Sequence, residues 1–544
     1  MNMKRYIIRA GILMLSLAAM PACTGDFLKI NTNPYEVSED DMKADDYIIA
    51  SVLSALSSSV VSTDINTCQF TDCLLGGPMG GYYSTTGAFA NTIDCFNATD
   101  NWTNVFFKSD NVIPALFTNL NLLDKFTDDP TALAIGKVIK VASLSRVTDA
   151  YGPIIYTENG KGNLAAKYDT QEEVYNAMFK ELDEAIAVFT ENSGFGISPN
   201  ADPVFDGTAV KWCRFANSLK LRLAMRLTYI PDGELLTKAD VRRLAEEAVK
   251  HEIGVITSNA DNAALQPKAM GEKGNPLYTA VKYNQPAGAD TGGDTHVAAD
   301  IVYYMNAYND PRREKYFIKS MFEGVPYVGI RVSVEKPSLT TVGYKYSGVN
   351  VAFNDPVQWM NAAEVAFLMA EAVAVWGFDM GDSAENLYNR GIELSFEQWE
   401  AGGASAYSQD DTRTPGTYTD PAGLYNYATP LTGLTVKWDD TATVEQKQER
   451  IMIQKWIANF NIGNEAWADH RRTGYPVFFP VHESGNKGIE KVDPVMGARR
   501  IPYPQDEYSQ NGANVRAAVA QLKGGADNYS SRMWWDNKDF SKTE

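Results

Sequence analysis

Aromatic and amide side chains gather in and just after one Gly-rich stretch of the sequence, "GGPMGGYYSTTGAFANTIDCF", which begins at Gly76. A flat ring packs against the C–H face of a sugar, while amide groups bond to its hydroxyls. We therefore take this stretch as the first candidate for a carbohydrate-binding site. Its candidate residues are Tyr82, Tyr83, Phe89, Asn101 and Trp102. Trp102 also begins an apolar helical face with Val105 and Phe106, so a place in the core is an equal alternative for it.

A second polar stretch, "YNQPAGADTGGDTH", contains ring, amide and carboxylate groups and ends at His296. Its candidate residues are Tyr283, Asn284, Asp290 and Asp294. The two aspartates could supply oxygen ligands to Ca²⁺, but their spacing lacks the full EF-hand pattern. We therefore expect no cofactor, and a solvated acidic loop without any ligand is the plain alternative.

Two further groups follow the same chemistry. Tyr344, with Tyr346 and Asn350 nearby, forms a third candidate, and Trp438 with Asp439 forms a fourth.

Metal or triad chemistry finds less support, because none of the four histidines lies within four residues of another. The cysteines beyond residue 23 form no CxxC pair, and a disulfide among Cys68, Cys73 and Cys95 stays open.

Charge and composition exclude one class of function. The net charge is −19, and no Lys/Arg cluster alternates with aromatic residues. An acidic surface repels phosphate backbones, so we expect no nucleic-acid partner. The hydrophobic content of 44% is ample for one large, elaborated globular domain.

Helices dominate the elements that must position these groups. In "VKWCRFANSLKLRLAMRLTY", Trp212, Leu219 and Leu223 recur on one face at helical spacing. Thr170 with Glu173, and Asp382 with Glu385, have the spacing of capping boxes. Further helices are expected near 44–60, 101–123, 130–148, 237–251, 297–307, 357–376, 444–461 and 511–523.

Paired helices predict the architecture. The span 361–399 holds two apolar helical patterns around a short Gly/Asp turn, as in a tetratricopeptide hairpin. Residues 130–148 with 171–190, and 208–229 with 237–251, are further candidate pairs. The sequence thus predicts a mostly α fold, a tetratricopeptide-like helical-repeat scaffold with long irregular loops and a few short strands. Generic antiparallel helices are the alternative.

The N-terminus has the form of an export signal. Lys4, Arg5 and Arg9 lead into a short apolar run that is too short to span a bilayer. The residues before Cys23 resemble a bacterial lipobox, although Met20 stands where Leu is more usual. This predicts a signal peptide over 1–22, a tether over 23–42 with acyl chains on Cys23, and a single domain over 43–544. An ordinary secreted protein is the alternative.

Ten segments, taken in order, resemble the SusD-like (RagB-like) outer-membrane nutrient-binding lipoproteins, and they span nearly the whole mature chain. These segments are "CTGDFLKINTNPY", "VTDAYGPIIYTE", "YDTQEEVYNAMFKELDEAI", "KWCRFANSLKLRLAMR", "NDPRREKYF", "AAEVAFLMAEAVAVWG", "NLYNRGIELSFEQW", "EAWADHRRTGYP", "RRIPYPQDEYSQN" and "RMWWD".

The resemblance implies a non-enzymatic function. It implies a largely helical protein outside the cell, held by its lipid to the outer membrane and resting as a lid on a SusC-like TonB-dependent transporter. Such proteins capture oligosaccharides, or in some branches peptides, and deliver them for import. It also implies that "DHRRTGYP", despite its catalytic look, is a helix end packed under the C-terminal segment.

Two other classes of function remain open on the sequence alone. A secreted glycoside hydrolase needs two carboxylates at suitable spacing, and 68 Asp and Glu residues guarantee such a pair by chance. A protein-interaction scaffold is also compatible with helical repeats. The ligand itself, glycan or peptide, does not follow from the fold.

Overall fold

Paired helices make up most of this computed structural model, as the apolar periodicity predicts. The structure describes residues 47–87, 89, 91–163 and 165–540. The predicted signal peptide, the tether and the lipid site Cys23 lie outside these residues. Residues 49–540 belong to one compact unit, which is the part discussed below.

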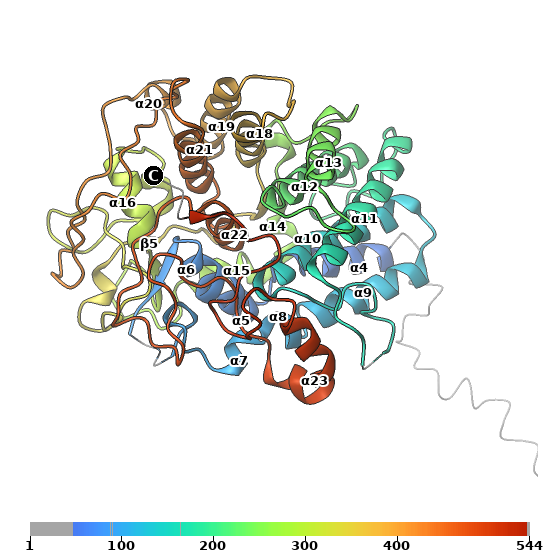
Figure 1. Ribbon diagram of the computed structural model, residues 1–544, viewed down its shortest axis with the longest axis horizontal. Helices are drawn as coiled ribbons and strands as arrows, with labels where there is room; N and C mark the ends of the chain where they lie inside the picture. The colour runs from blue at the N-terminus through green and yellow to red at the C-terminus, as the bar shows by residue number, and fades with distance from the viewer. Residues whose placement is uncertain (1–46, 88, 90, 164, 541–544) are drawn as a thin grey trace, which may run out of the picture. The chain divides into compact units, whose positions relative to one another are not determined.

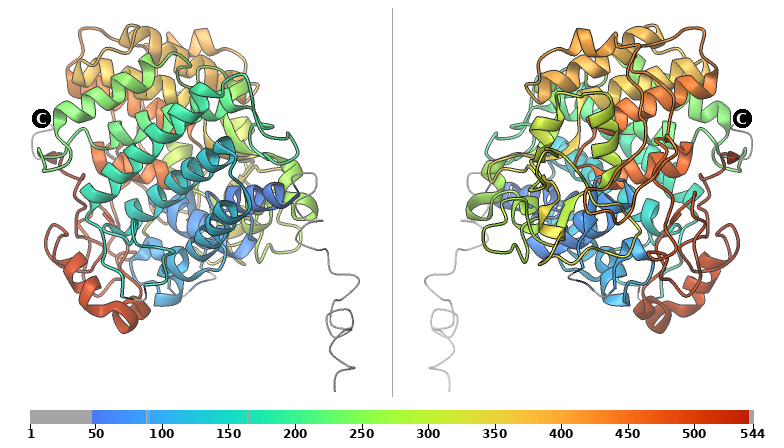
Figure 2. Two further views of the ribbon diagram at one scale, coloured as in Figure 1. Left: turned by 90° about the vertical axis from the view of Figure 1, so that its right-hand side faces the viewer. Right: turned by 90° about the vertical axis from the view of Figure 1, so that its left-hand side faces the viewer.

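The three predicted hairpins are confirmed. Helix α10 packs against α11, α12 against α13, and α18 against α19, and α21 adds a further helix against α18. Their bounds are α10 Pro130–Tyr151, α11 Gln171–Glu191, α12 Ala209–Arg226, α13 Lys238–Lys250, α18 Ala362–Trp376, α19 Ala384–Gln398 and α21 Val444–Ala458. In Figure 1 these helices fill the right and the top, whereas α16 lies among long loops at the left. The two views of Figure 2 show the hairpins and the loops from opposite sides.

Side-chain caps set several helix starts. Thr170 accepts from the N–H of Glu173, whose side chain in turn accepts from the N–H of Thr170, so the predicted capping box is confirmed. The capping box predicted for Asp382 with Glu385 is wrong, because the N-cap lies one residue later. Ser383 is the N-cap of α19, and it accepts the N–H of Asn386 at 3.2 Å.

Shorter helices fill the spaces between the pairs. The α-helices are α4 Tyr47–Ser57, α5 Ile65–Cys68, α6 Gly77–Met79, α7 Asp100–Thr103, α8 Val105–Lys108, α9 Ile113–Phe126, α14 Pro267–Met270, α15 Pro276–Ala280, α16 Ala299–Ala307, α17 Arg313–Tyr316, α20 Ala404–Ser408, α22 Gly463–Thr473 and α23 Gln505–Val519. The π-helix is η2 Gln69–Gly76, and the 3₁₀ turns are η3 Ile93–Cys95, η4 Asn259–Asp261, η5 Gly271–Lys273 and η6 Gly343–Lys345.

The continuous helix predicted for 101–123 is broken into α7, α8 and α9. Proline lacks a backbone N–H and fits the first turn of a helix but not its interior. Pro114 accordingly stands in the first turn of α9.

Within the described residues, three two-stranded antiparallel sheets connect the loops. Strand β1 pairs with β3, β2 with β6, and β4 with β5. Their bounds are β1 Tyr83–Thr85, β2 Ala263–Leu265, β3 Thr295–Val297, β4 Phe317–Ile318, β5 Gly348–Val349 and β6 Val357–Met360. Strand β6 occupies the start of the region predicted as a helix over 357–376. Asn361 follows the strand, and its side chain caps α18 by accepting the N–H of Glu364.

The core contains charged as well as apolar side chains. Trp212, Trp467 and Trp535 are among its largest fully buried residues, and so are Arg471 and Arg472. The four cysteines between residues 47 and 540 are buried free thiols, so no disulfide forms among Cys68, Cys73 and Cys95. Across the described residues, no helix has the length and apolar character needed to traverse a bilayer.

Candidate functional site

The short β1–β3 ladder joins the first three candidate regions. Ser84 lies opposite His296 and Thr85 opposite Thr295, and β3 also contacts β5. Two backbone bonds extend the connection: Gly87 donates its N–H to the Pro337 oxygen at 2.8 Å, and Val297 donates to the Ser347 oxygen at 3.1 Å. We call residues 82–102, 283–297 and 336–350 together the loop surface.

Several predicted residues present rings or polar groups on this surface. The side chain of Tyr283 is 53% exposed. Phe89, Trp102 and Tyr344 are half-buried, and Phe89 meets Trp102 edge to face with ring centroids 5.0 Å apart. The exposed polar candidates are Asn101, Asn284 and Asp290. The loop surface thus combines accessible rings with amides and a carboxylate, the groups that recognise a sugar.

Tyr82 and Tyr83 take a different place from the one predicted. Both are buried, at 0% and 2% exposure. The Tyr82 hydroxyl donates to the Trp456 oxygen at 2.6 Å, and that of Tyr83 donates to Asn461 Oδ1 at 2.5 Å. In this structure the two tyrosines are part of the core, and neither ring is accessible to a ligand.

The Gly-rich run explains this difference. Residues 76–81 are not an open ligand loop but end η2 and form α6, which packs against α22. A Cβ on Gly80 would lie 2.5 Å from the carbonyl oxygen of Gly463, closer than real Cβ contacts come. Glycine is therefore needed here because two backbones approach each other. The tyrosines that follow the run enter the core as a result.

A buried polar layer lies beneath the loop surface. Lys336 forms an ion pair with Asp94 at 2.5 Å, both side chains being at most 4% exposed, and its ammonium group also donates to Ser84 Oγ at 3.1 Å. This link joins two of the three loops, and the sequence reasoning missed it. The only local signal was a charged residue inside each Gly- and Thr-rich loop.

Two titratable groups in this layer have perturbed pKa values. Burial lowers the pKa of His296 to about 4, so its ring is neutral at physiological pH. Burial raises the pKa of Asp294, against the bond from Asn284, which donates to its Oδ2 at 2.8 Å. Asp294 is buried whereas Asp290 is exposed. Within the described residues, no three His, Cys, Asp or Glu side chains are arranged to hold a metal ion.

The fourth candidate lies outside the loop surface. Trp438 is buried, packs against Tyr388, and donates its indole N–H to Asp440 Oδ1 at 2.8 Å. Asp439 accepts from the N–H of Thr441, just before α21. Both residues therefore stabilise the turn that leads into α21.

The "DHRRTGYP" segment is structural, as predicted. Arg471 and Arg472 are fully buried at the end of α22. Arg471 donates to the backbone oxygens of Asp149 and Arg499 and stacks over Trp467, with 3.7 Å from its guanidinium carbon to the ring centroid. Arg472 forms a bidentate pair with Glu371, at 2.6 and 2.7 Å. Burial, helped by Arg499, lowers the pKa of His470 to about 3, which keeps its ring neutral.

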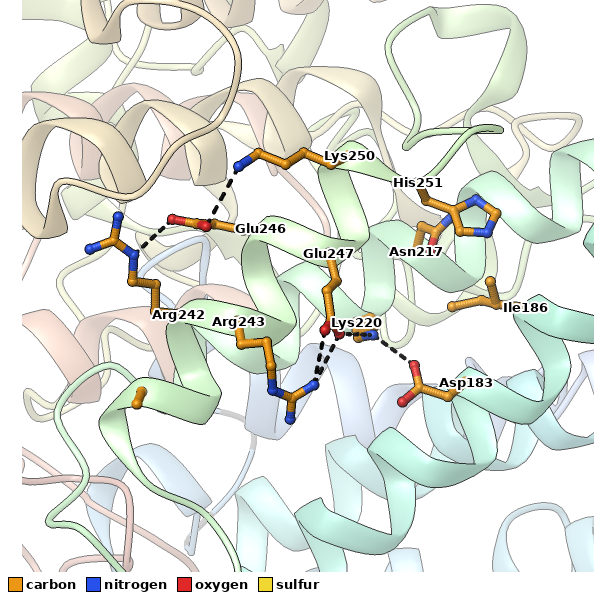
Figure 3. A pocket seen from close by; sticks show the side chains of 11 residues that line it. Asp183, Ile186, Asn217, Lys220, Arg242, Arg243, Glu246, Glu247, Lys250 and His251 are labelled. Carbon is orange, nitrogen blue, oxygen red and sulfur yellow. Dashed lines mark hydrogen bonds and ion pairs between the residues drawn. The ribbon is translucent and has the colours of Figure 1, made fainter.

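Helices α11, α12 and α13 line an open cavity of about 670 Å³, which we call the hairpin cavity. Figure 3 shows that its charged side chains face one another in pairs. Lys220 bonds to Asp183 at 2.7 Å and to Glu247 at 3.2 Å, and Arg242 bonds to Glu246 at 2.8 Å. Because these charges already neutralise each other, the cavity offers a ligand little beyond a solvated helix face.

Comparison with known proteins places this architecture in a family. The family model described as SusD-like, "Susd and RagB outer membrane lipoprotein", matches residues 29–536. The chain belongs to the SusD-like family. The predicted membership and the helical-repeat fold are thereby confirmed.

Solved SusD homologs superpose over nearly the whole chain. One from Bacteroides uniformis is 50% identical, with a TM-score of 0.86, and the match covers 91% of this chain and 100% of the homolog. One from Bacteroides thetaiotaomicron is 35% identical, with a TM-score of 0.81 and coverage of 90% and 99%. A chitin-binding SusD homolog from Flavobacterium johnsoniae is 32% identical, with the same TM-score and coverage. Among curated proteins, none matches this chain.

Proposed function

We propose that this SusD-like protein is held to the outer membrane by acyl chains on Cys23 and faces the cell exterior. There it binds an oligosaccharide on the loop surface and delivers it to a SusC-like TonB-dependent transporter. No bond-breaking step is part of this function, because capture needs only contact with rings and hydrogen-bonding groups.

The accessible ring of Tyr283 next to the exposed amide of Asn284 is the observation that carries the proposal. A half-exposed tyrosine loses water from an apolar face when a sugar covers it, and the Asn284 amide can bond to a hydroxyl beside that face. That a 32% identical homolog binds chitin agrees with a glycan ligand. A peptide ligand is the alternative within the same family.

Affinity electrophoresis against a polysaccharide panel tests the ligand class. We expect at least one polysaccharide to retard the protein, and Tyr283→Ala to reduce the retardation. Phe195→Ala is the matched control, because Phe195 is 77% exposed and lies between α11 and α12, outside the loop surface. Retardation by no glycan, combined with binding of a peptide library, would favour the peptide alternative.

Two further measurements separate the remaining functions. Reducing-end release from the retarding glycan would reveal a hydrolase, and we expect none. Delivery requires a partner, so we expect a large TonB-dependent barrel to co-purify with the protein from detergent-solubilised outer membranes. Substituting Cys23 with Ala should release the protein from the membrane and reduce that co-purification.

A further inference from the structure

A second cavity, of about 360 Å³, lies where segments remote in sequence converge. It is lined from α17, from the end of α19 and from the residues just after α21, and by Gln358 of β6. We call this cavity the inner pocket. Of the residues named above for the loop surface, only Asn350 lines it. Its size falls at the lower end of the range for small-molecule sites, roughly 300–1,000 Å³.

One wall of the inner pocket is aromatic. Trp399 is half-buried and packs against Tyr316, with ring centroids 4.5 Å apart. Tyr316 in turn stacks on Phe460 at 4.5 Å with nearly parallel rings. The indole is therefore held rigidly from behind, which suits a ring that receives a ligand.

The same walls carry polar atoms without partners. Among the described residues, neither Trp399 Nε1 nor Gln358 Oε1 has a hydrogen-bond partner, although both atoms are shielded from solvent. Such groups are uncommon in native structures, and an ordered water or a ligand is one way to satisfy them. One is a donor and the other an acceptor, so a hydroxyl group that reaches them after a small shift of the side chains could bond to either.

Two residues of the pocket hold backbone conformations that favour glycine. Glu400 has φ of 48° and Asn461 has φ of 77°. Strained non-glycine residues cluster at ligand sites, where the surrounding structure holds them in place. Asn461 Oδ1 accepts a hydrogen bond from the Tyr83 hydroxyl. The amide nitrogen of Asn461, Nδ2, therefore points away from Tyr83.

The rim adds two charges that are not neutralised locally. Lys315 and Glu400 are both exposed, and neither forms an ion pair with another described residue. This differs from the hairpin cavity of Figure 3, where the charges face one another in pairs. Charged groups of opposite sign beside several amides bond well to a neutral ligand that carries many hydroxyls.

We propose that the inner pocket binds a short saccharide, of one or two sugar rings, as a site additional to the loop surface. The rigid indole, the unpartnered donor and acceptor, the amides and the two free rim charges together form a site for a neutral polyhydroxyl ligand. The inference rests on the proposed function only in the chemical class of the ligand. The loop surface would bind along a chain, whereas the inner pocket has room only for a short piece.

Calorimetric titration of the full protein with mono- and disaccharides of glucose, galactose, mannose, xylose and N-acetylglucosamine tests this proposal. We expect at least one to bind, and Lys315→Met or Glu400→Gly to weaken it about tenfold, as when a hydrogen bond to a charged group is lost. Glu400→Gly suits the positive φ, so the fold should persist. The control is Lys319→Met, another exposed lysine, which does not line the pocket. Thermal melts check that each variant is folded.

The outcomes distinguish this site from the loop surface. If Tyr283→Ala weakens polysaccharide retardation while Lys315→Met weakens only the short saccharide, both sites are supported. If Tyr283→Ala abolishes binding of the short saccharide and both pocket variants leave it unchanged, the inner pocket is refuted and the proposed function stands. If no saccharide in the panel binds, or if a dipeptide panel binds instead, the inference is overturned. Pocket-dependent binding without any polysaccharide retardation would refute the proposed function alone.

Discussion

Removing one partner of the Glu371–Arg472 pair should destabilise the protein strongly. Both side chains are completely buried, and two hydrogen bonds of 2.6 and 2.7 Å join them. Glu371→Ala would leave the Arg472 guanidinium buried with only weaker contacts, the carboxylate of Asp469 at 3.3 Å among them. Breaking such a pair costs about 3–5 kcal/mol.

A third hydrogen bond raises the expected cost. Gln448 donates to Glu371 Oε1 at 2.8 Å, and losing that bond adds roughly 1 kcal/mol. We therefore expect Glu371→Ala to lower the free energy of unfolding by about 4–6 kcal/mol in equilibrium urea denaturation. Binding to the loop surface should be unchanged in the folded variant, because the pair is structural.

A matched exposed pair provides the control. On α19, Arg390 Nη1 lies 3.2 Å from Glu393 Oε2, and the two side chains are 46% and 55% exposed. Glu393→Ala should therefore lower the free energy of unfolding by less than about 1 kcal/mol. Replacing both buried partners, in Glu371→Leu with Arg472→Met, should recover much of the loss, since no unpaired charge remains. The reasoning is refuted if Glu371→Ala costs no more than Glu393→Ala.

Three further predictions concern stability. Burial lowers the pKa of His296 to about 4 and that of His470 to about 3, both below the ordinary 6.5. The neutral rings therefore contribute their full share to the free energy of unfolding above about pH 6.5. That share is lost as the pH falls toward the two lowered values. Lys455 and Arg472 outweigh burial and hold the pKa of Asp469 at about 2, so its share is lost between about pH 4 and 2. Burial raises the pKa of Asp300 to about 6, which acts in the opposite direction as the pH falls. His296→Gln should therefore lose less stability than the wild-type protein between about pH 7 and 4, and an equal loss in both proteins would contradict the role given to His296. Gly80→Ala should cost about 1–3 kcal/mol in urea denaturation because of the Gly463 contact, whereas Gly402→Ala, with open space around it, should cost little; equal costs would argue against the close approach. Tyr82→Phe should cost about 1 kcal/mol through the lost bond to Trp456 and leave glycan retardation intact, and a loss of retardation would return Tyr82 to the site.

The helix pairs could be predicted because their signals are local. Apolar residues at helical spacing and the Thr170 capping box depend only on neighbours in the sequence. Where a strand precedes a helix, as at β6 and Asn361, the local pattern does not separate the two. Pairing of β6 with β2, almost 100 residues earlier, decides the outcome.

The candidate site was only partly predictable for the same reason. The exposed Tyr283 and the ring pair Phe89–Trp102 lie on the loop surface that the chemistry indicated. Tyr82 and Tyr83 do not, because the glycines before them fit against Gly463, nearly 400 residues later. No local pattern reveals such a contact. The inner pocket likewise depends on several segments that meet only in the folded chain.

The central claim, that exposed rings of the loop surface bind a glycan, is tested most directly by one titration. The polysaccharide that retards the wild-type protein would be titrated calorimetrically into the Phe89→Ala/Tyr283→Ala double variant. Each lost stacking contact should cost about 1 kcal/mol, so we predict that the affinity falls at least tenfold while thermal melts show that the variant remains folded. An affinity equal to that of the wild-type protein would contradict the account.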